Sequence, residues 1–154
     1  MPGLAVGSTA PDFTLRDQHG GEVSLASLLD ERPVVVVFYP FAFTGVCTRE
    51  LHALRDSLPS LSAAASLVAV SCDSMFALRV FGDAEGLRFP LLSDFWPHGA
   101  VARAFGVFDA ERGCALRGTF VLDRAGVVRW QVVNALADAR SISELLAALG
   151  SVEG

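Results

Sequence analysis

Two largely apolar runs of strand length constrain the fold of this 154-residue chain most strongly. The runs, Pro33 to Tyr39 and Leu67 to Cys72, lack the polar alternation of half-exposed strands, which favours parallel strands covered on both faces. Between them, the segment Thr48 to Leu58 carries leucines at helical spacing and ends before Pro59. A strand, a helix and a strand joined by short connections predict a βαβ unit with a right-handed crossover.

Turn and cap signals divide the rest of the chain into short strands and helices. Two hairpins are predicted around glycine-containing turns, with strands Asp12 to Arg16 and Glu22 to Leu25, then Thr119 to Asp123 and Val127 to Val133. Two further helices are predicted. One runs from Ser74 to about Ala84, with Asp73 or Ser74 as its cap, and the other from the capping box at Ser141 to about Gly150. We expect Phe89 to Ala104 to be a connection with one helical turn near its end. The elements predict one α/β domain over residues 1–154 with a mixed sheet.

Composition excludes several classes of protein. A hydrophobic fraction of 52% with 19% charged residues predicts a compact globular chain, part of whose apolar surface is covered by a second subunit. A net charge of −5 without a basic cluster argues against nucleic acid as a partner. The first basic residue is Arg16, which does not fit a secretory signal. The longest apolar stretch, Val34 to Phe43, is about half of a membrane span and contains Pro40, so no membrane partner is expected.

The cysteines predict the compartment and argue against a metal site. The chain has three of them, Cys47, Cys72 and Cys114. An odd set without a Cys-x-x-Cys pair is neither a disulfide framework nor a zinc site, and it suits a reducing cytoplasm. The three histidines show no ligand spacing, and no metal, flavin or nucleotide cofactor is expected.

Cys47 is the strongest candidate for chemistry, because it lies where a buried strand passes into the start of a helix. In open α/β sheets the working site lies at the carboxyl ends of parallel strands. The free N–H groups and the dipole of a helix start favour negative charge, so a thiol placed there ionises more readily and becomes a nucleophile. The hydroxyl of Thr44 can hold an oxygen-bearing substrate against this sulfur. The alternatives are an inert buried Cys47, a Thr44 that only caps the helix and a Pro40 that only ends the strand.

The pattern Pro40-x-x-x-Thr44-x-x-Cys47 resembles the active-site motif of peroxiredoxins, the thiol peroxidases of the thioredoxin-fold superfamily. Further similar segments are Ala10 to Leu15, Val70 to Phe76, Phe89 to Asp94, Arg117 to Asp123 and Arg140-Ser141. The segment Ser93 to Gly99 resembles most the AhpE-type, one-cysteine subgroup of actinobacteria. The resemblance implies a thioredoxin-like fold of the peroxiredoxin variant, with a mixed central sheet flanked by helices and an N-terminal hairpin.

The resemblance also implies catalytic roles for four residues. Cys47 attacks one peroxide oxygen, becomes a sulfenic acid and expels water or an alcohol. Arg117 lies beside the sulfur and stabilises both the thiolate and the charge on the leaving oxygen. Thr44 orients the peroxide, and Pro40 shields the sulfur and restricts the loop.

Glu50 and Arg140 are expected to hold Arg117 in place, as in the family. An acid beside a thiolate disfavours the anion, so Glu50 fits this site only if it pairs with arginine. The alternative for both residues is a solvated surface. Cys72, where the family usually has valine, is expected in the core, and the alternative is a resolving or regulatory thiol. Cys114 is expected to be exposed in the loop after Glu111, as a possible resolving or regulatory thiol.

The commonest resolving cysteines of the family lie five residues after the nucleophile or in a C-terminal extension. Here the first position holds His52 and no cysteine follows Cys114, which favours one-cysteine chemistry. The main hypothesis is therefore a peroxidase for hydrogen peroxide and organic hydroperoxides that is recycled by an external thiol. The expected reductant is a low-molecular-weight thiol with a glutaredoxin-like protein, or thioredoxin. We expect a homodimer or a larger homo-oligomer. One alternative is a peroxide sensor or redox relay that oxidises a partner protein, and another is a disulfide reductase, which the missing Cys-x-x-Cys disfavours.

Overall fold

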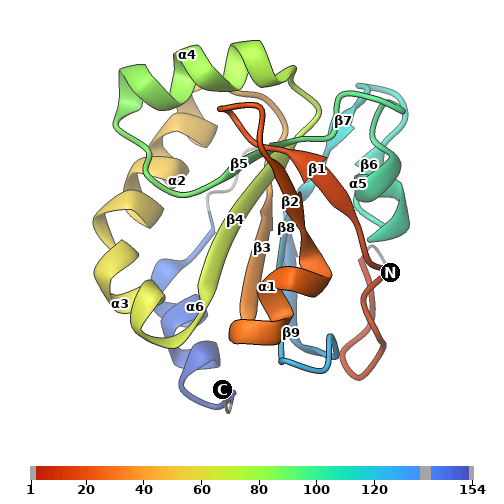
Figure 1. Ribbon diagram of the computed structural model, residues 1–154, viewed down its shortest axis with the longest axis vertical. Helices are drawn as coiled ribbons and strands as arrows, with labels where there is room; N and C mark the ends of the chain where they lie inside the picture. Colours follow the sequence, from red (N-terminus) through yellow and green to blue (C-terminus); the bar gives the residue numbers. More distant parts are fainter. Residues whose placement is uncertain (1–2, 136–139, 153–154) are drawn as a thin grey trace.

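A seven-stranded mixed sheet with helices on both faces forms the centre of the protein, as Figure 1 shows for the computed structural model. The structure describes residues 3–135 and 140–152. The strands of this sheet are β1 (Thr14–Arg16), β2 (Glu22–Ser24), β3 (Val34–Phe38), β4 (Ser66–Ser71), β5 (Leu91–Ser93), β8 (Arg117–Leu122) and β9 (Val128–Asn134). The spatial order is β2-β1-β5-β4-β3-β8-β9. A separate two-stranded sheet joins β6 (Phe108–Asp109) to β7 (Cys114–Ala115).

The helices cover the two faces of the sheet unequally. They are α1 (Leu25–Glu31), α2 (Gly45–Asp56), α3 (Leu58–Ala64), α4 (Met75–Glu85), α5 (Ala100–Ala104) and α6 (Ile142–Leu149). Side chains of α2, α3, α4 and α6 pack with Val35 and Val37 in one core. Side chains of α1 and α5 pack with Val34, Val36 and Phe38 in a second core on the opposite face. Successive residues of β3 therefore point into different cores, and this is why its sequence is apolar throughout.

The predicted βαβ unit is confirmed. Strands β3 and β4 are parallel, with Val36 opposite Val68, and every residue of β3 is buried. Strand β8 pairs antiparallel with β3 on its other side, which makes the sheet mixed as predicted. The N-terminal hairpin β1–β2 and the later hairpin β8–β9 also form. Helices α4 and α6 begin at their predicted caps, Ser74 and Ser141.

The structure also contains elements that the sequence reading missed. Helix α3 begins at Leu58, so Pro59 does not end the helical region but lies in the first turn of a new helix, where its missing N–H costs nothing. Strand β5 lies inside the segment that we expected to be a connection, and α1 follows β2 directly. Within the described residues, no helix has the length and apolar character needed to cross a membrane.

Candidate active site

Cys47 is the third residue of α2, the helix that follows the loop at the carboxyl end of β3. The helix starts at Gly45, three residues before its predicted start, so the thiol lies inside the first helical turn. Its side chain is fully buried. The first N–H groups of a helix have no partner within the helix and form the positive end of its dipole, which stabilises an anion at this place.

Thr44 occupies the N-cap position of α2 but does not cap it with its side chain. Its hydroxyl instead donates to the carbonyl of Phe41 at 2.8 Å, and its side chain remains exposed. The cap that we considered as the alternative role for Thr44 therefore does not form. The hydroxyl oxygen keeps lone pairs for a substrate in the space above α2.

Asp73 ties the loop before α2 to the end of β4. Its Oδ2 accepts from the Ala42 N–H at 2.9 Å and from the Ser71 hydroxyl at 2.7 Å. In the same loop, Phe43 has a φ of 69°, a left-handed conformation that costs a non-glycine residue about 1–2 kcal/mol. Its ring packs against Phe81 of α4 at 5.1 Å, a contact that helps to hold this conformation. The sequence analysis considered Asp73 only as a helix cap and missed this contact.

Arg117, the first residue of β8, brings a guanidinium directly to the sulfur. Its Nη1 lies 3.4 Å from Cys47 Sγ, and the residue is only 3% exposed. The same nitrogen donates to Oε1 of Glu50. Arg117 is therefore a buried neighbour of the thiol, as the family resemblance implied.

Glu50 and Arg140 complete a buried cluster of charges behind the sulfur. Glu50 lies one helical turn after Cys47, and its Oε2 accepts from the backbone N–H of Arg140 at 2.7 Å and from Arg140 Nε at 3.0 Å. Arg140 also donates from Nη2 to the carbonyl of Phe38 at the end of β3. The alternative placement of these residues on a solvated surface is excluded, since both are buried.

The charges of this cluster favour an anionic sulfur. Two guanidinium groups and one carboxylate, all buried, carry a net charge of +1. Burial lowers the pKa of Arg140, while the carboxylate of Glu50 opposes that effect. An uncompensated buried charge is costly, so a thiolate at Cys47 balances the cluster and stabilises it.

A cavity of about 250 Å³ opens above this cluster. Its wall includes Pro40, Thr44, Val46, Arg112, Cys114 and Arg117. Three of the residues predicted for the active site thus surround one space, and the guanidinium that contacts the sulfur forms part of its wall. The cavity is large enough for a small peroxide.

Cys114 is not exposed, and the sequence prediction of its place was wrong. It is fully buried on β7, although the turn that precedes it is at the surface. The reason is the β6–β7 hairpin, which turns the chain back into the protein directly after Gly113. Burial, followed by the negative charge of Asp109, raises the pKa of the Cys114 thiol.

Cys72 is a core residue, as the sequence predicted. It is 6% exposed at the end of β4 and is not among the residues of the cavity wall. Burial, followed by the charge of Asp94, raises its pKa from 9.0 to about 12, although a hydrogen bond from the backbone of Ala115 opposes this rise. At neutral pH Cys72 therefore keeps its proton.

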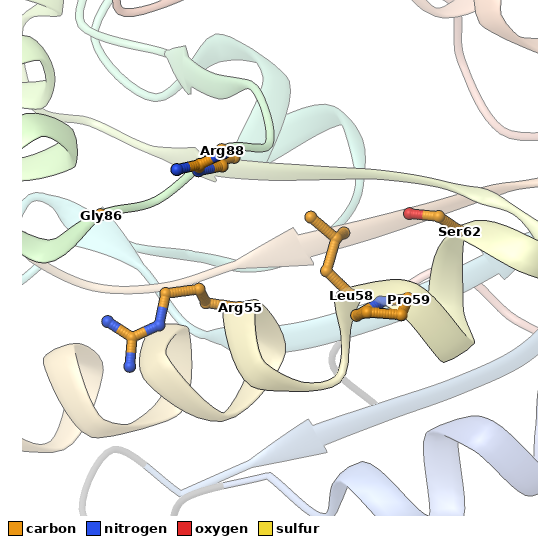
Figure 2. Close-up of a pocket in the computed structure, with 6 residues that line it drawn as sticks. All are labelled: Arg55, Leu58, Pro59, Ser62, Gly86 and Arg88. Carbon is orange, nitrogen blue, oxygen red and sulfur yellow. The ribbon is translucent and has the colours of Figure 1, made fainter.

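A second and larger cavity lies at the opposite end of α2 and carries none of this chemistry. It measures about 640 Å³ and is lined by Arg55, Leu58, Pro59, Ser62, Gly86 and Arg88, which Figure 2 shows around the junction of α2 and α3. No thiol lines it. His52 lies on the same helix, paired with Glu85 of α4 at 2.6 Å. We place the active site at the smaller cavity, because the buried charges and the thiol are there.

Comparison with known proteins identifies the family. Residues 6–131 match the AhpC/TSA family model. The chain belongs to this peroxiredoxin family. It is therefore a cysteine peroxidase, and the predicted family and enzyme class are confirmed. Alkyl hydroperoxide reductase E of Mycobacterium tuberculosis is 45% identical over 150 residues, which cover 95% of this peroxiredoxin and 98% of the relative.

Solved structures confirm the thioredoxin-like fold. Peroxidoxin BcpB from Mycobacterium tuberculosis superposes with a TM-score of 0.87 at 32% identity, over 98% of this chain and 99% of the other. The reduced 2-Cys peroxiredoxin of Plasmodium vivax gives 0.87 at 28% identity, over 96% and 81% of the two chains. The resemblance to the AhpE-type proteins that the sequence indicated agrees with the 45% identity.

Proposed function

We propose that this peroxiredoxin reduces hydrogen peroxide and organic hydroperoxides with Cys47 as its nucleophile, and that an external thiol then restores the enzyme. The observation that carries the proposal is the 3.4 Å contact between Arg117 and a sulfur in the first turn of α2, beside an open cavity. A thiolate is the reactive form of cysteine, and both the helix start and the guanidinium stabilise it.

In the first step, the Cys47 thiolate attacks the nearer peroxide oxygen in line with the O–O bond. The bond breaks, and the sulfur keeps one oxygen as a sulfenic acid. The other oxygen takes up the proton that the thiol released on ionising and leaves as water or an alcohol. Arg117 is placed to donate to the leaving oxygen while negative charge develops on it. The Thr44 hydroxyl positions the peroxide, and Pro40, which has no N–H, forms an apolar wall beside the sulfur.

Glu50 and Arg140 act through Arg117 and do not touch the peroxide. Glu50 accepts from both guanidinium groups, so it fixes the direction in which Arg117 points. Arg140 in turn holds Glu50 and contacts the end of β3. The cluster thereby fixes the donors before the substrate arrives, and fixed donors need no rearrangement as charge develops.

Recycling requires two electrons from outside the chain. A thiol attacks the sulfenic sulfur and releases water, and a second thiol then resolves the mixed disulfide. We propose a low-molecular-weight thiol with a glutaredoxin-like protein, or thioredoxin, as the reductant. The cysteine set fits a reducing cytoplasm.

The decisive experiment replaces Cys47 by serine and follows peroxide consumption in a single turnover without added thiol. We expect consumption of one equivalent by the natural protein and none by C47S. Cys72→Ala is the matched control, because it removes a buried thiol outside the cavity, and it should consume a full equivalent. Undiminished consumption by C47S would refute the proposal.

We also propose that the enzyme pairs with a second copy of itself. Phe76, Phe95 and Trp96 are large hydrophobic residues that are more than half exposed, and they line one surface cavity of about 590 Å³. Exposed apolar side chains gathered in this way are typical of interaction surfaces. Sedimentation at micromolar concentration should give at least a dimer, and Trp96→Glu should shift it toward the monomer. A natural protein that sediments only as a monomer would contradict this.

A further inference from the structure

Cys114 lines the cavity whose wall also includes Val46, the chain neighbour of the fully buried Cys47. Cys114 forms part of the wall of the 250 Å³ cavity, together with Arg117, whose guanidinium touches Cys47 Sγ. The two thiols are close enough for the charge of Cys47 to affect Cys114. A fully buried side chain in the wall of a reaction cavity is held near whatever forms there, whereas an exposed loop thiol is not.

We propose that Cys114 condenses with the sulfenic acid of Cys47 and forms an intramolecular disulfide. This inference rests on the oxidation of Cys47 proposed above. It changes the species that the external reductant meets, because the enzyme would present a disulfide and not a free sulfenic acid. It also assigns a function to a cysteine that lies at neither of the two common resolving positions, five residues after the nucleophile or in a C-terminal extension.

The step balances without any further reagent. The Cys114 sulfur attacks the Cys47 sulfur, an S–S bond forms and the S–O bond breaks. The departing hydroxide takes the thiol proton of Cys114 and leaves as water. The Cys47 sulfur is reduced from the sulfenic to the disulfide state, and the Cys114 sulfur is oxidised to the same state. An external dithiol then reduces the disulfide.

The hairpin that carries Cys114 is a small element outside the main sheet. Strands β6 and β7 pair through only two positions, Phe108 with Ala115 and Asp109 with Cys114, in a sheet separate from the main one (Figure 1). Gly113, with a φ of 69°, precedes the cysteine. A disulfide needs Cα atoms within about 7 Å of each other, so the proposal requires this short ladder to admit that approach.

The environment of Cys114 sets the speed of the step. Its attacking form is the thiolate, and burial raises the pKa of this thiol. Asp109, Asp73 and Cys47 oppose its ionisation, and Arg112 favours it. Cys72 also interacts electrostatically with Cys114, and Arg117 lines the same cavity. Disulfide formation should therefore accelerate as pH rises above neutral, by about tenfold per pH unit while the thiol is mostly protonated.

Cys72 does not compete for the sulfenic acid. Burial raises its pKa to about 12, so at neutral pH almost none of it is in the thiolate form that attacks a sulfenic acid. Replacing Cys72 by alanine thus gives a matched control with one cysteine removed and the proposed pair intact.

The test treats the whole protein with one equivalent of hydrogen peroxide and no thiol, then analyses it by mass spectrometry without reduction. The natural protein and C72A should both lose two hydrogens, and digestion should give a peptide pair linked through Cys47 and Cys114. Cys114→Ser should instead gain one oxygen, trapped by dimedone on Cys47. In excess peroxide, C114S should accumulate sulfinic acid, whereas the natural protein should not.

The outcomes separate this inference from the proposed function. A natural protein that carries a stable sulfenic acid on Cys47, or a disulfide from Cys47 to Cys72, would overturn the role of Cys114 and leave Cys47 as the peroxidatic residue. A natural protein that is not oxidised at Cys47 at all would overturn the proposed function itself. Peptide mapping of the natural protein decides between these results even if C114S fails to fold.

Discussion

The guanidinium of Arg117 lies 3.4 Å from the sulfur of Cys47, although the two residues are 70 positions apart in the sequence. The sheet creates this contact, because β8 is the antiparallel neighbour of β3 and its first residue comes beside the loop that follows β3. The order of strands thus places a fixed cation at the start of α2. The contact between Arg117 and Cys47 is a consequence of this topology and not of local sequence alone.

Exchanging Arg117 for lysine should slow the reaction with peroxide although the charge is kept. A lysine offers a compact charge without the fork of donors, so it cannot contact the sulfur, Glu50 and the leaving oxygen together. Loss of one donor aimed at developing charge costs roughly a hundredfold or more in rate. The measurement is the rate constant of Cys47 oxidation in stopped flow. Arg124→Lys, on an exposed turn, should keep the natural rate, and a full rate for R117K would contradict this role.

Exchanging Glu50 for glutamine should destabilise the fold. Glu50 is the one carboxylate between the two buried guanidinium groups, and its side chain is 1% exposed. Removing one partner of a buried charge pair costs about 3–5 kcal/mol of unfolding free energy. Urea unfolding of E50Q should show this loss.

The matched control for that experiment is Glu85→Gln. Glu85 pairs with His52 at 2.6 Å, but their side chains are 29% and 35% exposed. Breaking such a partly exposed pair should cost about 1 kcal/mol or less. Equal losses of unfolding free energy for the two variants would mean that the buried cluster stabilises the fold no more than the exposed pair does.

The sequence predicted the elements that carry strong local signals. The apolar runs of β3 and β4, the cap of α4 at Ser74 and the capping box of α6 all gave the right element. The three-residue strand β5 was missed, because its register depends on pairing with β4 and β1 and not on any pattern of its own. Propensity is a weak guide for strands this short.

Some residues of the candidate site could likewise be predicted from the sequence, and others could not. Thr44 and Cys47 could be placed from their position between a strand and a helix, and Arg117, Glu50 and Arg140 from the family resemblance. The contact of Asp73 with the loop and the burial of Cys114 could not be predicted, since both depend on where distant segments meet. A polar turn such as Glu111 to Gly113 indicates exposure, but it does not show where the next residue points.

Cys72 should make the stability of the protein fall at alkaline pH. Its folded pKa is about 12, whereas an unfolded cysteine ionises near 9.0. Below the pKa of the unfolded state, the thiol is protonated in both the folded and the unfolded protein, so its ionisation does not lower the unfolding free energy. Above that pKa the unfolded state loses the proton first, so the unfolding free energy falls by up to about 1.4 kcal/mol per pH unit until the folded pKa is reached.

The measurement is urea unfolding of the natural protein and of Cys72→Ala, each at about pH 8 and about pH 10 with reductant present, a pair of conditions that spans the ordinary thiol range. The natural protein should lose about 1 kcal/mol more than C72A over this interval. Other alkaline titrations affect both proteins equally and cancel in the comparison. Parallel losses would show that Cys72 ionises normally in the folded state.

Asp73 should control the rate of peroxide reduction without touching the substrate. Its carboxylate accepts from the Ala42 N–H at 2.9 Å, which fixes the loop between Pro40 and Thr44 against β4. A hydrogen bond to a charged group contributes about 1.5–3 kcal/mol. If its loss lets the loop shift, so that the activation barrier rises by even the lower value, the reaction slows about tenfold. Asp73→Ala should show this loss in single-turnover oxidation of Cys47, whereas Asp73→Asn, which keeps an acceptor oxygen, should retain most of the rate.

The matched control is Asp83→Asn on the exposed face of α4, where the carboxylate only pairs with Arg79 at 3.7 Å. If D73A oxidised as fast as D83N, the loop would hold its shape without this contact, and the packing of Phe43 on Phe81 would have to be sufficient.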